Sequence, residues 1–275
     1  MMFGPPLTAA DAALVESVVV PRYLSFFSAV LLDMMLPYEA ARVANLGCRS
    51  GVPDALVAEK MRGGAIVGVD ASAAAIELAR RKAASLPGAQ ASYLIHDGPP
   101  PAPLPEAGFT HAIALHPVCR PAQRQALLNE LRRLLVPGGQ ALIALPLRGS
   151  FPELSDMGRE CALKQDLSIL TLAIDASTTA RPTLETIVQE LEEAGLTDVE
   201  SDVQLVSVTF NAGREFLEDA IARLLVFPDV TAMLEVDASV SDALLRYVHD
   251  AVSKYWSEGP FELTVNVGCA SGRRP

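Results

Sequence analysis

The sequence predicts an α/β protein whose doubly wound sheet is mostly parallel, ends in an antiparallel strand and carries a helical cap. Three patterns indicate this fold. Short apolar runs alternate with helical patterns between residues 42 and 145, a glycine-bearing turn follows the first run, and residues 260–269 alternate apolar and polar side chains. Apolar strands separated by helices are typical of a parallel sheet covered on both faces, whereas strict alternation is typical of a strand with two unlike faces.

The composition is that of a globular protein with a full core. The chain has 275 residues, of which 50% are hydrophobic and 20% charged, and its net charge is −11. Residues 1–150 contain 13 Lys and Arg against 11 Asp and Glu, whereas residues 151–275 contain 9 against 22. A chain without a basic surface is not expected to bind nucleic acid. The acidic second half is a candidate docking face for a protein partner.

The cysteines and the N-terminal region bear on redox state and location. The four cysteines are widely separated and lack the paired spacing of a metal site, so we expect no metal and reduced thiols. The first basic residue is Arg22, and the uncharged run from Tyr23 to Leu32 is far shorter than the roughly 20 residues that cross a bilayer. We therefore expect a cytoplasmic protein without a membrane partner.

Residues 1–40 are predicted to form N-terminal helices. Thr8 is a suitable N-cap for a helix that runs to about Val20, and Pro21 starts or kinks the next helix. Apolar side chains on that second helix recur at helical spacing and mark a buried face. They are Phe26, Phe27, Val30, Leu31 and Met34.

Residues 41–147 are predicted to form the ligand-binding core. Strands are expected at 42–46, 65–69, 91–95, 111–115 and 140–145, and helices at 52–62, 72–85 and 121–135. Prolines between residues 99 and 105 exclude a helix there, so that connection is either a rigid spacer or a flap over a cofactor. Ligands of such sheets bind beyond the carboxyl ends of the strands. Four polar residues fall at those ends: Asn45, Asp70, Asp97 and His116.

The second half departs from this alternation. Residues 148–180 and 211–258 are predicted to form a helical cap, and residues 181–210 and 259–275 to complete the sheet. One expected helix after Ser155 places Leu163, Leu167 and Leu170 on a shared face. Another opens at residues 182–183 and closes at Gly195. Between residues 199 and 210 the apolar positions shift phase after residue 205, which predicts a bulge.

The turn after strand 42–46 has the composition of a nucleotide-binding loop. Gly47 and Gly51 allow backbone N–H groups and a helix N-terminus to approach a ligand. Asp70 ends the next strand about twenty residues after the first glycine, where a carboxylate can accept two hydrogen bonds from a ribose. The alternative is a strand-to-helix turn that serves packing alone.

Four motifs, in this order, resemble those of the class I S-adenosylmethionine-dependent methyltransferases, whose fold is Rossmann-like. The first family motif, acid-x-Gly-x-Gly-x-Gly, is matched by Asn45, Gly47, Arg49 and Gly51. The other three lie at residues 68–72, 96–98 and 129–139. The resemblance spans roughly residues 40 to 147, and it implies S-adenosylmethionine as the cofactor.

The resemblance also assigns roles to single residues. Eight are implied to bind the cofactor: Asn45, Gly47, Cys48, Gly51, Asp70, Ala71, Asp97 and Gly98. Among them Asp70 would contact the ribose, and Asp97 with Gly98 the adenine. His116 follows the fourth strand and is a candidate base or acceptor-orienting residue, the alternative being a structural histidine at a strand end.

Two residues depart from the family pattern. Asn45 replaces the acid of the first motif and keeps hydrogen-bonding capacity without charge. Arg49 replaces a glycine, so its side chain must clash with the cofactor, turn away from it or meet the cofactor's carboxylate.

We expect an S-adenosylmethionine-dependent methyltransferase that acts on a small-molecule or carrier-bound substrate under the helical cap. The alternative is a non-catalytic methyltransferase-like scaffold that binds a protein through its acidic helical half. A dinucleotide-dependent dehydrogenase fits less well because the loop lacks Gly-x-Gly-x-x-Gly spacing.

Overall fold

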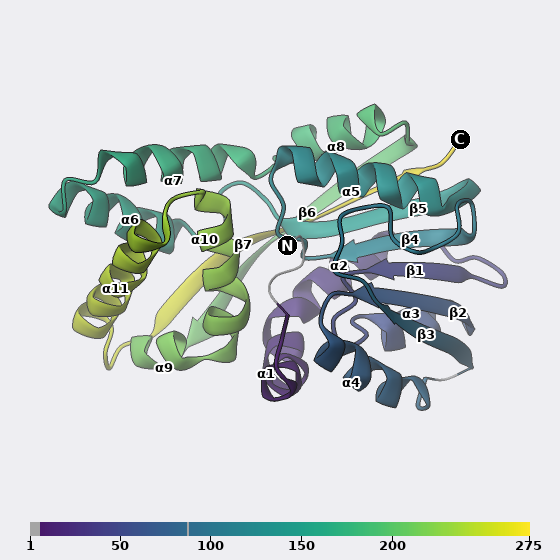
Figure 1. The fold of residues 1–275 in the computed structure, drawn as a ribbon, viewed down its shortest axis with the longest axis horizontal. Helices are drawn as coiled ribbons and strands as arrows, with labels where there is room; N and C mark the ends of the chain where they lie inside the picture. The colour runs from purple at the N-terminus through teal and green to yellow at the C-terminus, as the bar shows by residue number, and fades with distance from the viewer. Residues whose placement is uncertain (1–5, 87) are drawn as a thin grey trace.

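The computed structural model describes residues 6–86 and 88–275, and it contains a seven-stranded sheet with strand order β3-β2-β1-β4-β5-β7-β6 (Figure 1). The strands are β1 (Arg42–Leu46), β2 (Gly64–Asp70), β3 (Ala89–Ile95), β4 (Phe109–Leu115), β5 (Leu135–Pro146), β6 (Thr197–Phe210) and β7 (Phe261–Arg273). Strands β1 to β5 pair in parallel, whereas β7 is antiparallel to both β5 and β6. The predicted fold class is confirmed.

Helices cover both faces of the sheet. α5 (Pro121–Leu134) and α8 (Leu184–Glu193) pack on one face, where Leu128, Leu131 and Leu191 are fully buried. Figure 1 shows α2 (Ser25–Met34), α3 (Asp54–Lys60) and α4 (Ala73–Ala83) on the other side of the sheet. The apolar strands are therefore buried from two directions, as their composition predicts.

The N-terminal helices form one continuous helical stretch. α1 (Ala9–Leu14) runs into a π-helical segment, η1 (Val15–Leu24), which continues into α2. Thr8 caps α1 as predicted, since its Oγ1 accepts a hydrogen bond from the Asp11 N–H. Pro21 lies inside η1 and does not start a new helix, so the first of the two alternatives expected for it is wrong. The wider π turn accommodates a residue that has no N–H to donate.

This stretch, Ala9–Met34, is long and apolar enough by length and composition to cross a membrane. In the structure one side of it belongs to the protein core: Val19, Tyr23, Leu24, Phe27 and Leu31 are each fully buried. It packs against β5, β6 and β7. Burial of this face explains the apolar composition, which is typical of a helix in a protein core.

The connection between β3 and β4 is the one that shapes the site. Residues 96–108 contain no helix, as the prolines predict, whereas the connections from β1 to β2, from β2 to β3 and from β4 to β5 each contain one. Parallel strands usually require a helical crossover. The face beside α5 is therefore covered here by a proline-rich loop.

The helices of residues 148–180 and 211–258 gather at one end of the long β6–β7 hairpin, on the left of Figure 1. They are α6 (Pro152–Lys164), α7 (Ser168–Ala180), α9 (Gly213–Glu218), η2 (Ala222–Val226), α10 (Phe227–Leu234) and α11 (Ala238–Tyr255). We call this group the cap. It packs on β7 through α6, and α6 contacts both α7 and α11.

Two local predictions in this half are wrong. Asp166 adopts a φ of 54°, which separates α6 from α7, so Leu163 and Leu170 do not share a face: Leu163 is 81% exposed and Leu170 is buried. The phase shift near residue 205 is not a bulge either. β6 pairs with β7 without interruption from Glu200 onward, and the register shift lies between Thr197 and Glu200. Val206, Val208 and Phe210 lie on the buried face of β6, whereas Leu205 lies on the opposite face and is 71% exposed.

Candidate functional site

The loop between β1 and α3 lies against the end of β2. The N–H groups of Gly47 and Cys48 both donate to the carbonyl oxygen of Val69, at 2.8 and 3.1 Å. Gly47 and Gly51 have φ values of 70° and 78°, in the left-handed region that glycine adopts without strain. The two glycines thus stand where the loop needs a left-handed backbone, and the loop lies beside Asp70.

Asp70 is fixed by backbone donors from both sides. Its Oδ2 accepts from the Arg49 N–H at 2.9 Å and its Oδ1 from the Ser72 N–H at 2.8 Å. Each carboxylate oxygen retains a lone pair for a further donor. The residue is 8% exposed, so it presents a preoriented acceptor at the carboxyl end of β2.

Asn45 holds the loop through side-chain hydrogen bonds. Its Nδ2 donates to the Val52 carbonyl at 2.9 Å and to Asp54 Oδ1 at 2.7 Å, while the Tyr93 hydroxyl donates to Asp54 Oδ2 at 2.9 Å. Asn45 and Asp54 are 0% and 1% exposed. Burial raises the pKa of Asp54, and these two hydrogen bonds oppose that rise. The carboxylate expected at position 45 is therefore supplied nearby by Asp54.

Arg49 does not turn outward. Its φ is 49°, the residue is 5% exposed, and its guanidinium donates to two carbonyl oxygens at the end of β4. Nη1 lies 2.9 Å from the Leu115 oxygen and Nη2 lies 3.1 Å from the His116 oxygen. The side chain thus links the loop after β1 to the end of β4.

His116 is fully buried behind Arg49. Its Nε2 lies 3.1 Å from the Tyr23 hydroxyl, and its ring packs edge-on against Phe27. Nδ1 finds no hydrogen-bond partner among the described residues. Burial, followed by the charge of Arg49, holds the pKa of His116 well below its usual value, so the imidazole is neutral at pH 7. It sits in a packed interior, and it is not among the residues that line the cavity described next.

One cavity of about 510 Å³ opens at the carboxyl ends of β1, β2 and β3. Its lining residues come from these strand ends, the proline-rich loop and one face of α5. They are Leu46, Gly47, Val69, Asp70, Ala71, His96, Asp97, Gly98, Pro99, Pro100, Ala102, Ala122, Gln123, Ala126, Leu127 and Glu130. This position is the topological switch point between β1 and β4, where open α/β sheets bind ligands.

The structure brings together five of the nine predicted site residues around this cavity: Gly47, Asp70, Ala71, Asp97 and Gly98. The other four lie elsewhere. Asn45 and His116 are buried as described above, Gly51 packs against Tyr93, and the Cys48 thiol lies beneath the loop beside Gly68. The proline-rich connection forms part of the cavity wall, which fits the flap interpretation better than the spacer.

Sequence reasoning missed the contribution of α5. Ala122, Gln123, Ala126, Leu127 and Glu130 share one helical face, since they are spaced by one, three, one and three positions. The small residues Ala122 and Ala126 keep that face open. Helical periodicity combined with small side chains just after β4 was the signal that could have revealed it.

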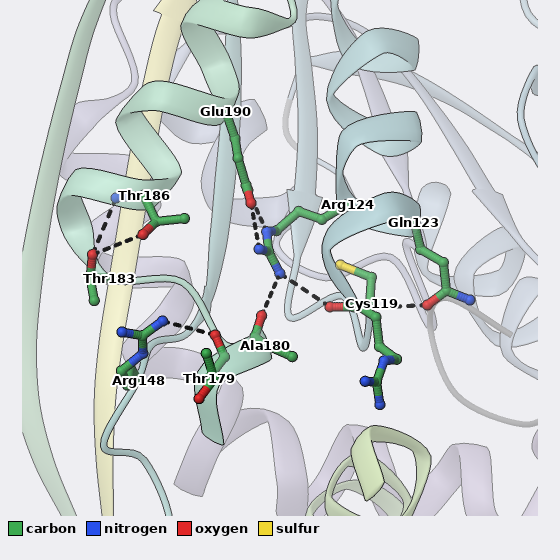
Figure 2. A network of polar contacts seen from close by, with 10 residues as sticks. Cys119, Gln123, Arg124, Arg148, Thr179, Ala180, Thr183, Thr186 and Glu190 are labelled. Atoms are coloured by element: carbon green, nitrogen blue, oxygen red, sulfur yellow. Dashed lines mark hydrogen bonds and ion pairs between the residues drawn. The ribbon is translucent and has the colours of Figure 1, made fainter. Parts of the chain in front are cut away.

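α5 is held in place by a buried guanidinium. Figure 2 shows Arg124 between Glu190 of α8 and the carbonyls of Cys119 and Ala180. Arg124 binds both oxygens of Glu190 in a fork, and its side chain is 1% exposed. One residue therefore joins α5, α8 and the end of α7, and it sets the position of the helix that lines the cavity.

The charge of the cavity restricts its ligands. Three carboxylates line it, those of Asp70, Asp97 and Glu130, and no Lys or Arg is present among the sixteen lining residues. Glu130 is neutralised by Arg133 at 2.8 Å. Phosphate recognition relies on cationic side chains or backbone donors. The cavity is therefore suited to a neutral or cationic ligand with hydroxyl and amino donors, and not to a nucleotide phosphate.

No group of His, Cys, Asp and Glu residues within the described chain has an arrangement that could hold a metal ion. No cap residue is among the sixteen that line this cavity. The cap instead reaches the loop before α5, where Arg120 donates to the Met233 carbonyl of α10 at 2.6 Å.

Comparison with known proteins relates this site to a family. Residues 43–139 match the model of a family described as a methyltransferase domain. This segment contains the glycine loop, Asp70, the proline-rich connection and α5. No curated protein matches the chain.

Solved structures share the fold at low identity. Phosphoethanolamine N-methyltransferase 2 of Haemonchus contortus, in complex with S-adenosyl-L-methionine, is 16% identical with a TM-score of 0.58; the match covers 98% of this chain and 57% of that one. A Haloferax volcanii complex of a methyltransferase activator with a methyltransferase matches at 18% identity and a TM-score of 0.54, covering 97% of each chain. The cyclase SpnF matches at 16% identity with a TM-score of 0.51, and the match covers 91% of this chain and 80% of that one.

These likenesses show the fold, and a cyclase among them shows that the fold alone does not determine the reaction. The family match is more specific, since it falls on the residues that build the loop and the cavity. The segment that forms this site, residues 43–139, thus matches a methyltransferase domain.

Proposed function

We propose that the protein is an S-adenosylmethionine-dependent methyltransferase and that the cavity beside Asp70 binds the nucleoside end of the cofactor. The observation that carries the proposal is the Asp70 carboxylate, held by two backbone N–H groups at the rim of a cavity without Lys or Arg. A ribose offers the two hydroxyl donors that such a carboxylate accepts. Asp97 also lines the cavity, where its carboxylate is an acceptor for an exocyclic amine.

The two ends of the cofactor fit differently. The nucleoside end fits the cavity in size and in hydrogen-bonding character. The amino-acid end requires the Arg49 side chain to move, because Arg49 fills the region between the loop and the end of β4.

The acceptor is proposed to be a small molecule or a carrier-bound metabolite. Phosphoethanolamine N-methyltransferase acts on a small molecule, as its name states, and it shares the fold. The second half of the chain has 22 Asp and Glu against 9 Lys and Arg, so a protein partner with a basic surface is proposed for that half. Cytoplasmic location stays a prediction from the sequence.

The second candidate function is a non-catalytic scaffold. The observation that favours it is the position of Arg49, which closes part of the expected cofactor site. Leu163, Ile169 and Leu172 add an exposed apolar surface on the cap, each more than half exposed. This function predicts that the protein binds no adenine ligand at all.

Replacing Asp70 by Asn is expected to weaken adenosine binding by about 10- to 100-fold, because a charged acceptor of the ribose hydroxyls is lost. The amide oxygen can still accept one of the two backbone N–H groups, and the other loses its acceptor. Isothermal titration with adenosine measures the effect. Asp33→Asn is the matched control, since Asp33 is exposed at the end of α2 and outside the cavity. Equal affinities for the wild type and the Asp70 variant would contradict the ribose assignment.

A further inference from the structure

The cavity ends abruptly on one side of the loop. Its wall includes Gly47 and Asp70, but none of residues 48–51 and none of residues 109–119. A ligand whose ribose lies at Asp70 therefore has open space toward β3 and α5. Toward β4 it meets protein.

Arg49 is the group that closes this side. Its backbone N–H holds Asp70, and its side chain crosses to the carbonyls of Leu115 and His116. Both guanidinium nitrogens that face β4 are hydrogen-bonded, and the residue is 5% exposed. A chain attached to the ribose and directed toward β4 would need the volume that this side chain occupies.

The N-terminal helical stretch closes the same side from outside. Glu16 of η1 accepts a hydrogen bond from the Ser50 hydroxyl, and it pairs with Lys82 at 2.6 Å. Lys82 also donates to the Ser50 carbonyl at 3.0 Å. Ser50 is 1% exposed as a result. The second half of the glycine loop is thus bonded to the protein itself on both sides.

We propose that Arg49, in the position seen here, makes this cavity favour adenine nucleosides that carry no amino-acid chain at C5′, so that S-adenosylmethionine binds only by displacing the Arg49 guanidinium from the Leu115 and His116 carbonyls. This inference rests on the proposed function, in that it places the nucleoside end of the ligand at Asp70. Adenosine and 5′-deoxy-5′-methylthioadenosine belong to this class. S-adenosylhomocysteine contains the same nucleoside with an amino-acid chain.

The physical basis is the set of contacts that Arg49 must give up. A ligand with an amino-acid chain displaces the guanidinium from two buried carbonyl oxygens, and each such oxygen left without a donor lowers the net affinity. A nucleoside with a short C5′ group leaves both hydrogen bonds intact. Selectivity then arises from the chain that is excluded, not from an extra contact with the nucleoside.

The test is a set of calorimetric titrations of the full chain with 5′-deoxy-5′-methylthioadenosine and with S-adenosylhomocysteine. The wild type is expected to bind the first at least about tenfold more tightly than the second. Arg49→Gly is expected to raise the affinity for S-adenosylhomocysteine by about tenfold or more and to change that for the nucleoside by less than about threefold. Glycine suits the φ of 49° and keeps the N–H that binds Asp70.

Arg62→Gly is the matched control, because Arg62 also has a positive φ, 53°, but is exposed and outside the cavity. It should alter neither affinity. Equal or tighter binding of S-adenosylhomocysteine by the wild type would overturn the inference while leaving the proposed function intact, and this comparison stands even if Arg49→Gly does not fold. An unchanged ratio of affinities in folded Arg49→Gly would also overturn it. Failure of both ligands to bind the wild type would overturn the proposed function together with the inference.

Discussion

Replacing Asn45 by Asp, the residue that the family motif carries, is expected to destabilise the protein by about 2–4 kcal/mol at neutral pH. The Asn45 amide donates to Asp54 Oδ1 at 2.7 Å, and both residues are buried. An aspartate at position 45 places two carboxylates in direct contact without water. Two such groups cannot both ionise, so one must bind a proton at a cost.

The pH dependence has a defined sign. The carboxyl that takes the proton has a pKa raised above the value of about 4 that it has in the unfolded chain. Below that unfolded value the penalty is absent, and it grows as the pH rises through the raised pKa. Asp54 alone already has this sign in the wild type, because burial raises its pKa. Urea unfolding of the variant at pH 5 and pH 8 should therefore show the larger deficit at pH 8.

Two controls separate charge repulsion from a general loss of packing. Asn211→Asp makes the same change beside Glu215, at 2.9 Å, but on the surface, where we expect an effect below about 0.5 kcal/mol. The double variant Asn45→Asp with Asp54→Asn exchanges the two groups and should recover the part of the lost stability that comes from the two carboxylates, while the hydrogen bond from position 45 to the Val52 carbonyl stays lost. If the double variant is as unstable as Asn45→Asp alone, the repulsion is not the cause.

Arg124→Met is expected to lower the free energy of unfolding by about 3–5 kcal/mol, because it leaves Glu190 as an unpaired charge in the interior. The carbonyls of Cys119 and Ala180 lose their donor as well. Methionine fills a similar volume, so the loss of stability comes mainly from the missing Arg124–Glu190 hydrogen bonds and not from a void. Since Arg124 positions α5, adenosine binding should weaken in the same variant. Denaturant unfolding and calorimetric titration measure the two effects.

The double variant Arg124→Met with Glu190→Met should be less destabilised than Arg124→Met alone, since no charge is left unpaired. Arg159→Met is the exposed counterpart: Arg159 pairs with Asp156 and Asp175 on the surface, and its loss should cost less than about 1 kcal/mol. A small effect of Arg124→Met, similar to that of Arg159→Met, would show that the buried fork does not hold α5 in place.

The core of the fold could be predicted because its signals are local. β1, α3, β2 and α4 are each indicated by apolar runs of strand length, helical spacing or glycine turns. Each of these signals lies within a few residues of the element that it indicates. The alternation from Phe261 to Val267 predicted one buried face of β7, and each of its four apolar residues is buried. Backbone geometry and local burial suffice for such elements.

The rest depended on distant partners. The path of the Arg49 side chain is set by carbonyls of β4, which lie more than sixty positions further along the chain. Val203 and Leu205 resemble core residues in sequence, yet they are exposed on the face of β6 opposite to its buried residues. Asp166 breaks a helix that the leucine spacing favours. In each case tertiary position, which no local pattern records, decided the outcome.

The most direct test of the account is a crystal structure of the protein grown with adenosine. We predict that the ribose hydroxyls contact Asp70, that the base lies beside Asp97 and Gly98 against Leu127 of α5, and that Arg49 keeps its hydrogen bonds to the carbonyls of Leu115 and His116. Adenosine bound elsewhere, or an empty cavity at a saturating concentration, would contradict the assignment of this cavity to the nucleoside end of the cofactor.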